Sequence, residues 1–149
     1  MKSLEKKIKK TELLIKARKA QLDTESQSLA LIRQRKIAQL QELDRHQKNY
    51  INGVNDLNIE RQTGDRRMLS TIERSVDHSK SQWYKSLREV KTWEEKEKQQ
   101  IEQVLLAQRN LKSMEKVQEN HFQALKKEVD VREQKEMDDL SVQRFARNR

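Results

Sequence analysis

The sequence contains no proline, and its only two glycines, Gly53 and Gly64, lie within one short stretch. Proline lacks the backbone N–H that a helix requires, and glycine readily adopts the positive φ that ends a helix. The segments on either side of this stretch therefore contain nothing that would stop a helix. We predict one helix over about residues 3–60, a turn within about 58–66, and a longer second helix over about residues 66–146.

The turn is expected near Gly64, because the following residue, Asp65, can cap the second helix by accepting a backbone N–H bond. A turn at Asn52-Gly53 is the alternative. The expected fold is all-α: two long helices that form an antiparallel coiled-coil hairpin, as one domain over residues 1–149. The C-terminal part of the longer second helix should then extend past the N-terminus.

Composition excludes an ordinary globular core, since 33% of the residues are hydrophobic and 38% are charged. Such a chain is either disordered or an extended helical protein. Its many Lys, Glu, Gln, Arg and Leu residues favour helices, because they lose little rotamer freedom there. The absence of cysteine excludes disulfides, thiolate metal sites and a cysteine nucleophile. No apolar run approaches the roughly 20 residues of a membrane span, so we expect a cytoplasmic protein without membrane insertion.

Apolar residues recur every seven positions in both predicted helices, which is typical of a left-handed coiled coil. Seven of the eight residues in the first column are apolar, and seven of the nine in the second. The columns three residues further on are more polar, so the seam between the helices is expected to be thin. The first column is Ile8, Ile15, Leu22, Leu29, Lys36, Leu43, Tyr50 and Leu57, and the second is Leu69, Val76, Trp83, Val90, Glu97, Val104, Leu111, Gln118 and Leu125.

No residue pattern typical of catalysis is present. His46, His78 and His121 are isolated, and each is expected to be solvated or at the edge of the seam. Neither glycine lies in a phosphate-binding motif. We therefore expect no enzyme activity and no catalytic, cofactor-binding or metal-binding residues. Trp83 and Trp93 are interpreted as large seam residues, with an exposed anchor for a partner as the alternative.

The net charge of +9 is concentrated near the N-terminus, where residues 1–22 carry eight basic and two acidic residues. Together with Leu4, Ile8, Leu14 and Ile15, these basic residues predict an amphipathic helix. A solvated helix end is the simplest interpretation. An acidic protein surface is the next candidate partner, followed by anionic lipid headgroups. Nucleic acid is disfavoured, because the chain has neither a basic-region dimer layout nor an aromatic stacking platform.

The C-terminal segment contains E-Q-K, then an acidic pair, then basic residues, at Glu133-Gln134-Lys135, Asp138-Asp139 and Arg144 to Arg147. This pattern resembles the closing segment of the FliJ/YscO family, which are small coiled-coil stalk proteins of bacterial type III export. Residues 68–77 resemble the segment that follows the turn in that family. The pattern of its first helix is matched by Gln39, Leu40, Leu43, Gln47 and Tyr50.

The resemblance implies an antiparallel stalk, similar to that of rotary ATPases, which inserts into a hexameric export ATPase and promotes its assembly. It also implies binding to the cytoplasmic domain of the export-gate membrane protein and to secretion chaperones, at the cytoplasmic face of the inner membrane. Residues 1–22 and 128–149, paired at the base of the hairpin, would enter the ATPase ring. The implied ATPase-binding residues are Lys6, Lys7, Lys9, Lys10, Arg132, Gln134, Lys135, Asp138 and Arg144. The implied gate-binding residues are Gln39, Leu43, His46, Tyr50, Met68 and Ile72, with Ser75 and Ser79 beside them.

Several of these residues allow a second interpretation. Leu43 and Tyr50 lie in the seam column, so they could equally pack between the helices.

His46 replaces an aromatic residue that is common in the family, and Ser75 and Ser79 are more polar than in flagellar members. These departures favour an injectisome over a flagellum.

A monomer that binds no nucleic acid is expected. Two alternatives to the stalk remain open. A self-associating structural coiled coil would have a mass that depends on concentration. A basic helix that binds an anionic surface would lose affinity steeply as salt is added.

Overall fold

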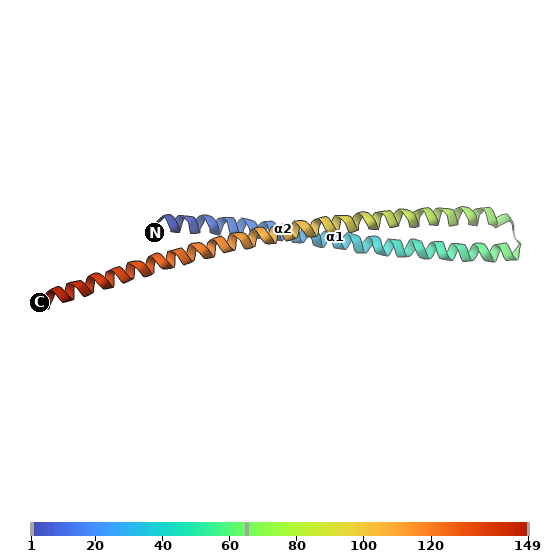
Figure 1. The fold of residues 1–149 in the computed structure, drawn as a ribbon. Coiled ribbons are helices and arrows are strands. Elements are labelled where there is room, and N and C mark those ends of the chain that lie inside the picture. Colours follow the sequence, from blue (N-terminus) through green and yellow to red (C-terminus); the bar gives the residue numbers. More distant parts are fainter. Residues whose placement is uncertain (1, 65, 149) are drawn as a thin grey trace. The chain divides into compact units, whose positions relative to one another are not determined.

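Two helices account for nearly all of the residues that the computed structural model describes, which are residues 2–64 and 66–148. Helix α1 comprises Lys2–Thr63 and helix α2 comprises Arg66–Arg147 (Figure 1). These described residues include no strand. The prediction of an all-α antiparallel coiled-coil hairpin with a longer second helix is confirmed. The predicted helix cap, Asp65, lies outside the described residues.

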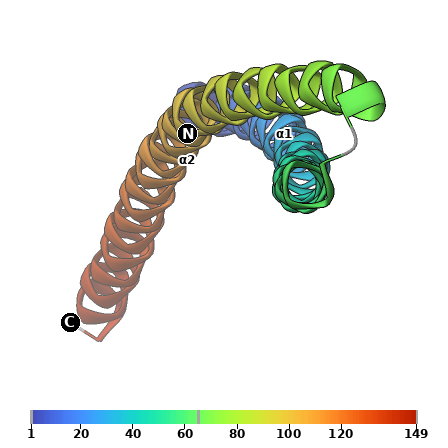
Figure 2. The same ribbon diagram turned by 90° about the vertical axis from the view of Figure 1, so that its right-hand side faces the viewer.

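The turn between the helices is centred on Gly64, as predicted. Gly64 has a φ of 77°, in the left-handed region, and its N–H donates to the Glu60 carbonyl oxygen at 3.1 Å. The Thr63 hydroxyl donates to the same carbonyl at 3.1 Å. These bonds satisfy one of the last carbonyl groups of α1, where the helix itself runs out of N–H donors. Figure 2, viewed from this end, shows the end of α1 beside the start of α2.

Gly53 lies inside α1, so the alternative prediction of a turn at this residue is wrong. It faces α2: a Cβ atom built on Gly53 would lie only 3.2 Å from Val76 Cγ2. Carbon atoms in contact normally lie about 3.5–4.0 Å apart. The missing side chain therefore permits a close approach of the two helices at this layer.

The chain divides into two compact units. Unit 1 combines Met1–Thr24 with Leu105–Arg149, and unit 2 is Glu25–Val104. Each unit thus contains one part of α1 packed against one part of α2. A single functional domain over residues 1–149 stays a prediction.

In unit 2 the predicted heptad columns form the seam between the helices. Leu57, Val76 and Val90 are buried, and the other residues of these columns are half-buried. The two charged residues in these mainly apolar columns face each other: Lys36 Nζ lies 3.5 Å from Glu97 Oε2. Because each charge has a partner, neither is left alone in a partly buried position.

Polar side chains also link the two helices of unit 2. The Gln100 side-chain amide donates to the Glu25 backbone carbonyl at 3.0 Å and to Glu25 Oε2 at 2.5 Å. Nearer the turn, Arg61 Nη2 lies 3.6 Å from Glu73 Oε1. Residues later in α1 contact residues earlier in α2, as two antiparallel helices require. The hydrogen bonds of Gln100 and the Arg61–Glu73 ion pair thus add polar contacts to the apolar seam of unit 2.

Unit 1 has a seam of the same kind, in which Ile8, Ile15 and Ala107 are buried. Thr11 is only 4% exposed, and its hydroxyl donates to the Lys7 carbonyl oxygen at 2.8 Å. The Thr11 hydroxyl oxygen also lies 3.3 Å from His121 Nδ1. Since a hydroxyl has one hydrogen, His121 Nδ1 is the donor in this second contact. His121 therefore lies at the seam and links the two helices.

Candidate functional site

The gate-binding residues predicted on α1 lie along the seam of unit 2, where Gln39, Leu43, His46 and Tyr50 are all half-buried. Each therefore has one part packed between the helices and another part accessible to a partner. A groove of about 210 Å³ runs beside them. Every side chain that lines it is polar, so it offers hydrogen bonds and charges. Its lining residues are Gln39, Glu42, His46, Gln82, Lys85, Ser86 and Glu89.

Glu42 joins two basic residues at this groove. Its Oε2 accepts a hydrogen bond from Arg45 at 2.6 Å and lies 3.5 Å from His46 Nε2. The hydrogen bond from Arg45, with smaller contributions from the charges of Arg45 and His46, lowers the pKa of the Glu42 carboxyl below its ordinary value. Glu42 thus presents a negative charge between two basic side chains on the accessible face.

An aromatic stack begins at Tyr50 and reaches the surface. The Tyr50 and Trp83 ring centroids lie 5.4 Å apart, and those of Trp83 and Tyr84 lie 5.5 Å apart. Trp83 is half-buried and packs at the seam, as predicted, whereas Tyr84 is exposed. Tyr84 was not among the residues predicted from the sequence, although its position next to Trp83 could have indicated it. Trp93 is also half-buried, and Lys96 Nζ lies 4.2 Å from its ring centroid.

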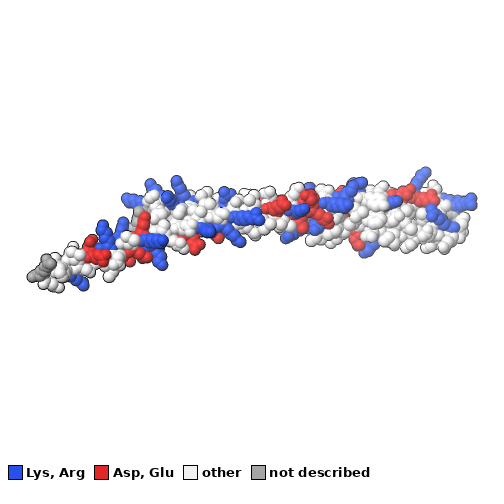
Figure 3. All heavy atoms as spheres, in the orientation of Figure 1, with Lys and Arg blue, Asp and Glu red and all other residues white. Residues whose placement is uncertain are grey.

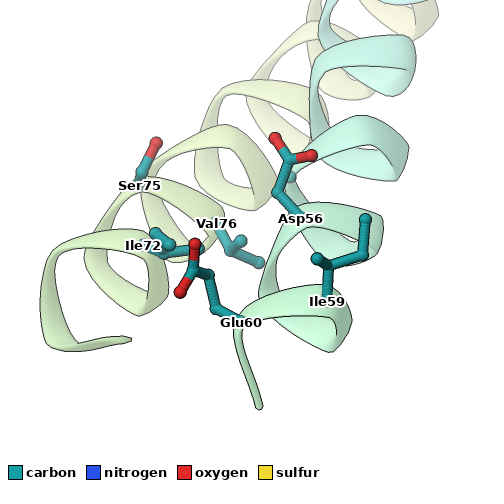
Figure 4. Close-up of a pocket in the computed structure, with 7 residues that line it drawn as sticks. Asp56, Ile59, Glu60, Ile72, Ser75 and Val76 are labelled. Atoms are coloured by element: carbon teal, nitrogen blue, oxygen red, sulfur yellow. The ribbon is translucent and has the colours of Figure 1, made fainter. Parts of the chain in front are cut away.

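The gate-binding residues predicted on α2 lie near the turn. Met68 is exposed, whereas Ile72 is half-buried and lines a groove of about 280 Å³. Figure 4 shows this groove between α1, which contributes the carboxylates Asp56 and Glu60, and α2, which contributes Ile72 and Ser75. The remaining lining residues are Gly53, Ile59 and Val76. The groove thus combines an apolar lining with carboxylate groups, a chemistry that suits the side chain of a lysine or an arginine.

In unit 1, the four lysines predicted to contact the ATPase are all exposed on α1. They are Lys6, Lys7, Lys9 and Lys10. Three of them line a shallow groove together with Lys2 and Ser3. Figure 3 shows the basic side chains that project from this end of α1. The surface there is strongly basic, as predicted.

The predicted ATPase-binding residues of α2 lie in a segment that does not pack on α1. Arg132, Gln134, Lys135, Asp138 and Arg144 are exposed, and so is every other side chain over residues 130–148. Gln134 donates to Asp138 at 3.2 Å along the same helix. This segment extends past the N-terminal end of α1 (Figure 1), which confirms the predicted extension.

The expected pairing of residues 1–22 with residues 128–149 is therefore wrong over residues 130–148, where every side chain is exposed. The Thr11–His121 contact places residues 1–22 beside an earlier part of α2. The physical reason is the length of the helices, because α2 is longer than α1 and its last turns extend past the start of α1. The basic lysines and the C-terminal segment are consequently separate surfaces of unit 1.

Comparison with known proteins assigns a family. A family model described as "Flagellar FliJ protein" matches residues 7–149. The chain belongs to the FliJ family. FliJ-family membership identifies it as a component of flagellar type III export that interacts with other parts of the export apparatus. No curated protein and no solved structure matches the chain.

Two further findings concern the described residues of this FliJ-family chain. Over residues 2–64 and 66–148, no helix is both long and apolar enough to cross a membrane. The same residues contain no group of three or more His, Asp or Glu side chains placed to hold a metal ion.

Proposed function

We propose that this FliJ-family chain is a non-enzymatic stalk and escort protein of the flagellar export apparatus. It promotes assembly of the hexameric export ATPase, couples the ATPase to the cytoplasmic domain of the export-gate membrane protein, and binds free secretion chaperones. It acts as a monomer at the cytoplasmic face of the inner membrane. The matched family is described by its flagellar member, which supports the flagellum over the injectisome favoured by His46, Ser75 and Ser79.

The exposed C-terminal segment of α2 is the observation that carries this proposal. At 1.5 Å per residue, the helical residues from 130 to 147 provide about 27 Å of helix on which every side chain is exposed. A partner can therefore contact this segment without opening the hairpin. Arg132, Lys135 and Arg144 give it basic groups that can pair with carboxylates of the ATPase ring.

The ATPase contact is tested by measuring ATP hydrolysis by the cognate export ATPase with and without the full-length chain. The wild-type chain should stimulate hydrolysis. Reversing three charges of the segment, with Arg132→Glu, Lys135→Glu and Arg144→Glu, should remove the stimulation. Lys112→Glu, Lys116→Glu and Lys126→Glu provide the matched control, because these three lysines are also exposed on α2 of unit 1 but precede the segment. Equal stimulation by both triple variants would contradict the proposed contact.

The gate contact is tested separately, by binding of the full-length chain to the purified cytoplasmic domain of the gate protein. Met68 is 52% exposed, so Met68→Glu should weaken this binding without changing the helical content. Leu106→Glu is the control, because Leu106 is similarly exposed on α2, at 50%, but lies in unit 1. A gate domain that binds both variants equally would exclude Met68 from the contact.

A further inference from the structure

The side of α1 that points away from α2 in unit 1 is strongly basic. At about 100° per residue, seven side chains of residues 2–20 lie within about 60° of Leu13 around the helix. Five of these seven are lysines, the other two are alanines, and all of them are exposed, as is Leu13. The buried residues Ile8, Thr11 and Ile15 lie on the opposite side, about 140–160° from Leu13. The lysine face comprises Lys2, Lys6, Lys9, Lys10, Leu13, Lys16, Ala17 and Ala20.

The lysine face carries no negative charge. The two acidic residues of this stretch, Glu5 and Glu12, lie about 80° and 100° from Leu13 around the helix. Among the residues that the structure describes, none of the five lysines forms an ion pair. At 1.5 Å per residue, the face is about 27 Å long from Lys2 to Ala20. Its charges therefore attract an anionic surface along one side of the helix.

An apolar patch lies on the same face. Leu13 is 70% exposed, and Ala17 and Ala20 follow it on the next two turns of the helix. Lys16 lies at the edge of this patch, so its aliphatic stem can cover apolar surface while its ammonium group stays among polar groups. The face thus combines positive charge with a small apolar surface, as do helices that lie on a bilayer.

The use of lysine in place of arginine favours a lipid surface over an acidic protein surface. Lysine is depleted in protein–protein interfaces, whereas arginine is enriched there because its planar group pairs with carboxylates in a fixed geometry. The one arginine of residues 2–20, Arg18, lies about 140° from Leu13 and outside the lysine face. Lysine ammonium groups bind phosphate as point charges, and the headgroups of a fluid bilayer can rearrange around them.

We propose that the lysine face docks on the surface of a bilayer that contains anionic phospholipids. The five ammonium groups would lie among the headgroup phosphates, and Leu13 would enter the boundary between headgroups and acyl chains. Lys6, Lys9 and Lys10, which the family resemblance assigns to the ATPase, would contact lipid instead. The exposed segment over residues 130–148 is not part of the lysine face, so the proposal does not depend on the ATPase contact.

The first test is co-sedimentation of the full-length chain with lipid vesicles. One set contains equal parts of phosphatidylglycerol and phosphatidylcholine, and the other contains phosphatidylcholine alone. The chain should bind only the anionic vesicles, and its binding should weaken as salt is added. Each lysine near an anionic surface contributes about fivefold in affinity, so Lys6→Gln with Lys10→Gln should lower the partition coefficient by at least about tenfold.

A matched control separates the lysine face from net charge. Lys112→Gln with Lys116→Gln removes the same charge at exposed positions of α2 in unit 1, and it should change the partition coefficient little. Circular dichroism confirms that each variant is folded. Equal losses of vesicle binding in the two double variants would overturn the proposal, because binding would then depend only on net charge.

A fluorophore tests which side of the chain meets the lipid. The chain has no cysteine, so Ala17→Cys and Ser113→Cys each provide a single site for an environment-sensitive dye. Ser113 is exposed on α2 of unit 1. With anionic vesicles, the emission of the dye at position 17 should shift to shorter wavelength, and that of the dye at position 113 should not. The same shift at both positions, or at neither, would contradict docking through the lysine face.

Soluble polyglutamate provides the comparison with an acidic protein surface. It presents carboxylates without an apolar layer, so Leu13→Ser should weaken binding to anionic vesicles and leave binding to polyglutamate unchanged. Leu14→Ser is the control, because Leu14 lies about 100° from Leu13 around the helix and is 47% exposed. Binding to polyglutamate without binding to anionic vesicles would overturn the proposal in favour of an acidic protein partner. Absence of binding to both would overturn it outright.

Discussion

Replacement of Val90 with alanine tests whether the thin seam holds the two helices together. Val90 lies on α2 in unit 2 and is 5% exposed. The substitution removes two carbon atoms, each of which contributes about 0.8 kcal/mol when buried. The seam borders solvent, so neighbouring side chains or water can fill much of the vacated space. We therefore expect the loss of burial to lower the free energy of unfolding by about 1.5–2 kcal/mol, with only a small cavity contribution.

A matched substitution separates the effect of lost burial on stability from the effect of the changed helix propensity. Val131→Ala makes the same chemical change on α2 at a side chain that is 68% exposed. Alanine favours a helix more than valine does at both positions, so the difference between the variants reports burial. Urea unfolding followed by circular dichroism measures both, and the expected difference is about 1.5–2 kcal/mol. Equal free energies of unfolding for the two variants would refute the argument that the buried seam stabilises the hairpin.

Three further predictions concern the turn and the charged groups. Gly64→Ala should destabilise the chain by about 1–2 kcal/mol, because alanine is strained at a φ of 77°; an unchanged urea midpoint would contradict this. Arg45→Ala should raise the pKa of Glu42 toward its ordinary value by removing their hydrogen bond, and an NMR titration without that rise would show that the bond is not formed in solution. A double-mutant cycle with Lys36→Ala and Glu97→Ala should give a coupling of about 0.5–1 kcal/mol; no coupling would mean that the two charges are solvated independently.

The turn and the seam could be predicted from the sequence because each depends on local chemistry. Gly64 meets a need for positive φ, and seven-residue spacing selects one face of each helix. Lys36 and Glu97 even indicate the register, because the charged exceptions in the two columns have opposite signs and meet in the structure. Gly53 was ambiguous, since its lack of a side chain suits a turn as well as a close approach to Val76.

The candidate sites were less predictable, because they depend on how far each helix extends and on which side chains remain accessible. The expected pairing of residues 1–22 with residues 128–149 ignored the register that the seam imposes. The half-burial of Leu43 and Tyr50 follows from their seam positions, yet the column alone could not tell how much of each would remain accessible. The stacking of Tyr84 on Trp83 depends on rotamers, which periodicity does not determine. The partners came from the family resemblance rather than from the pattern of residues.

Assembly of the export ATPase is the most direct test of the stalk proposal. Native mass spectrometry would measure the hexameric fraction of the cognate ATPase, alone and with the full-length chain. The account predicts a larger hexameric fraction with the wild-type chain, and no increase with the variant reversed at Arg132, Lys135 and Arg144. A hexameric fraction that does not change when the wild-type chain is added would contradict the account.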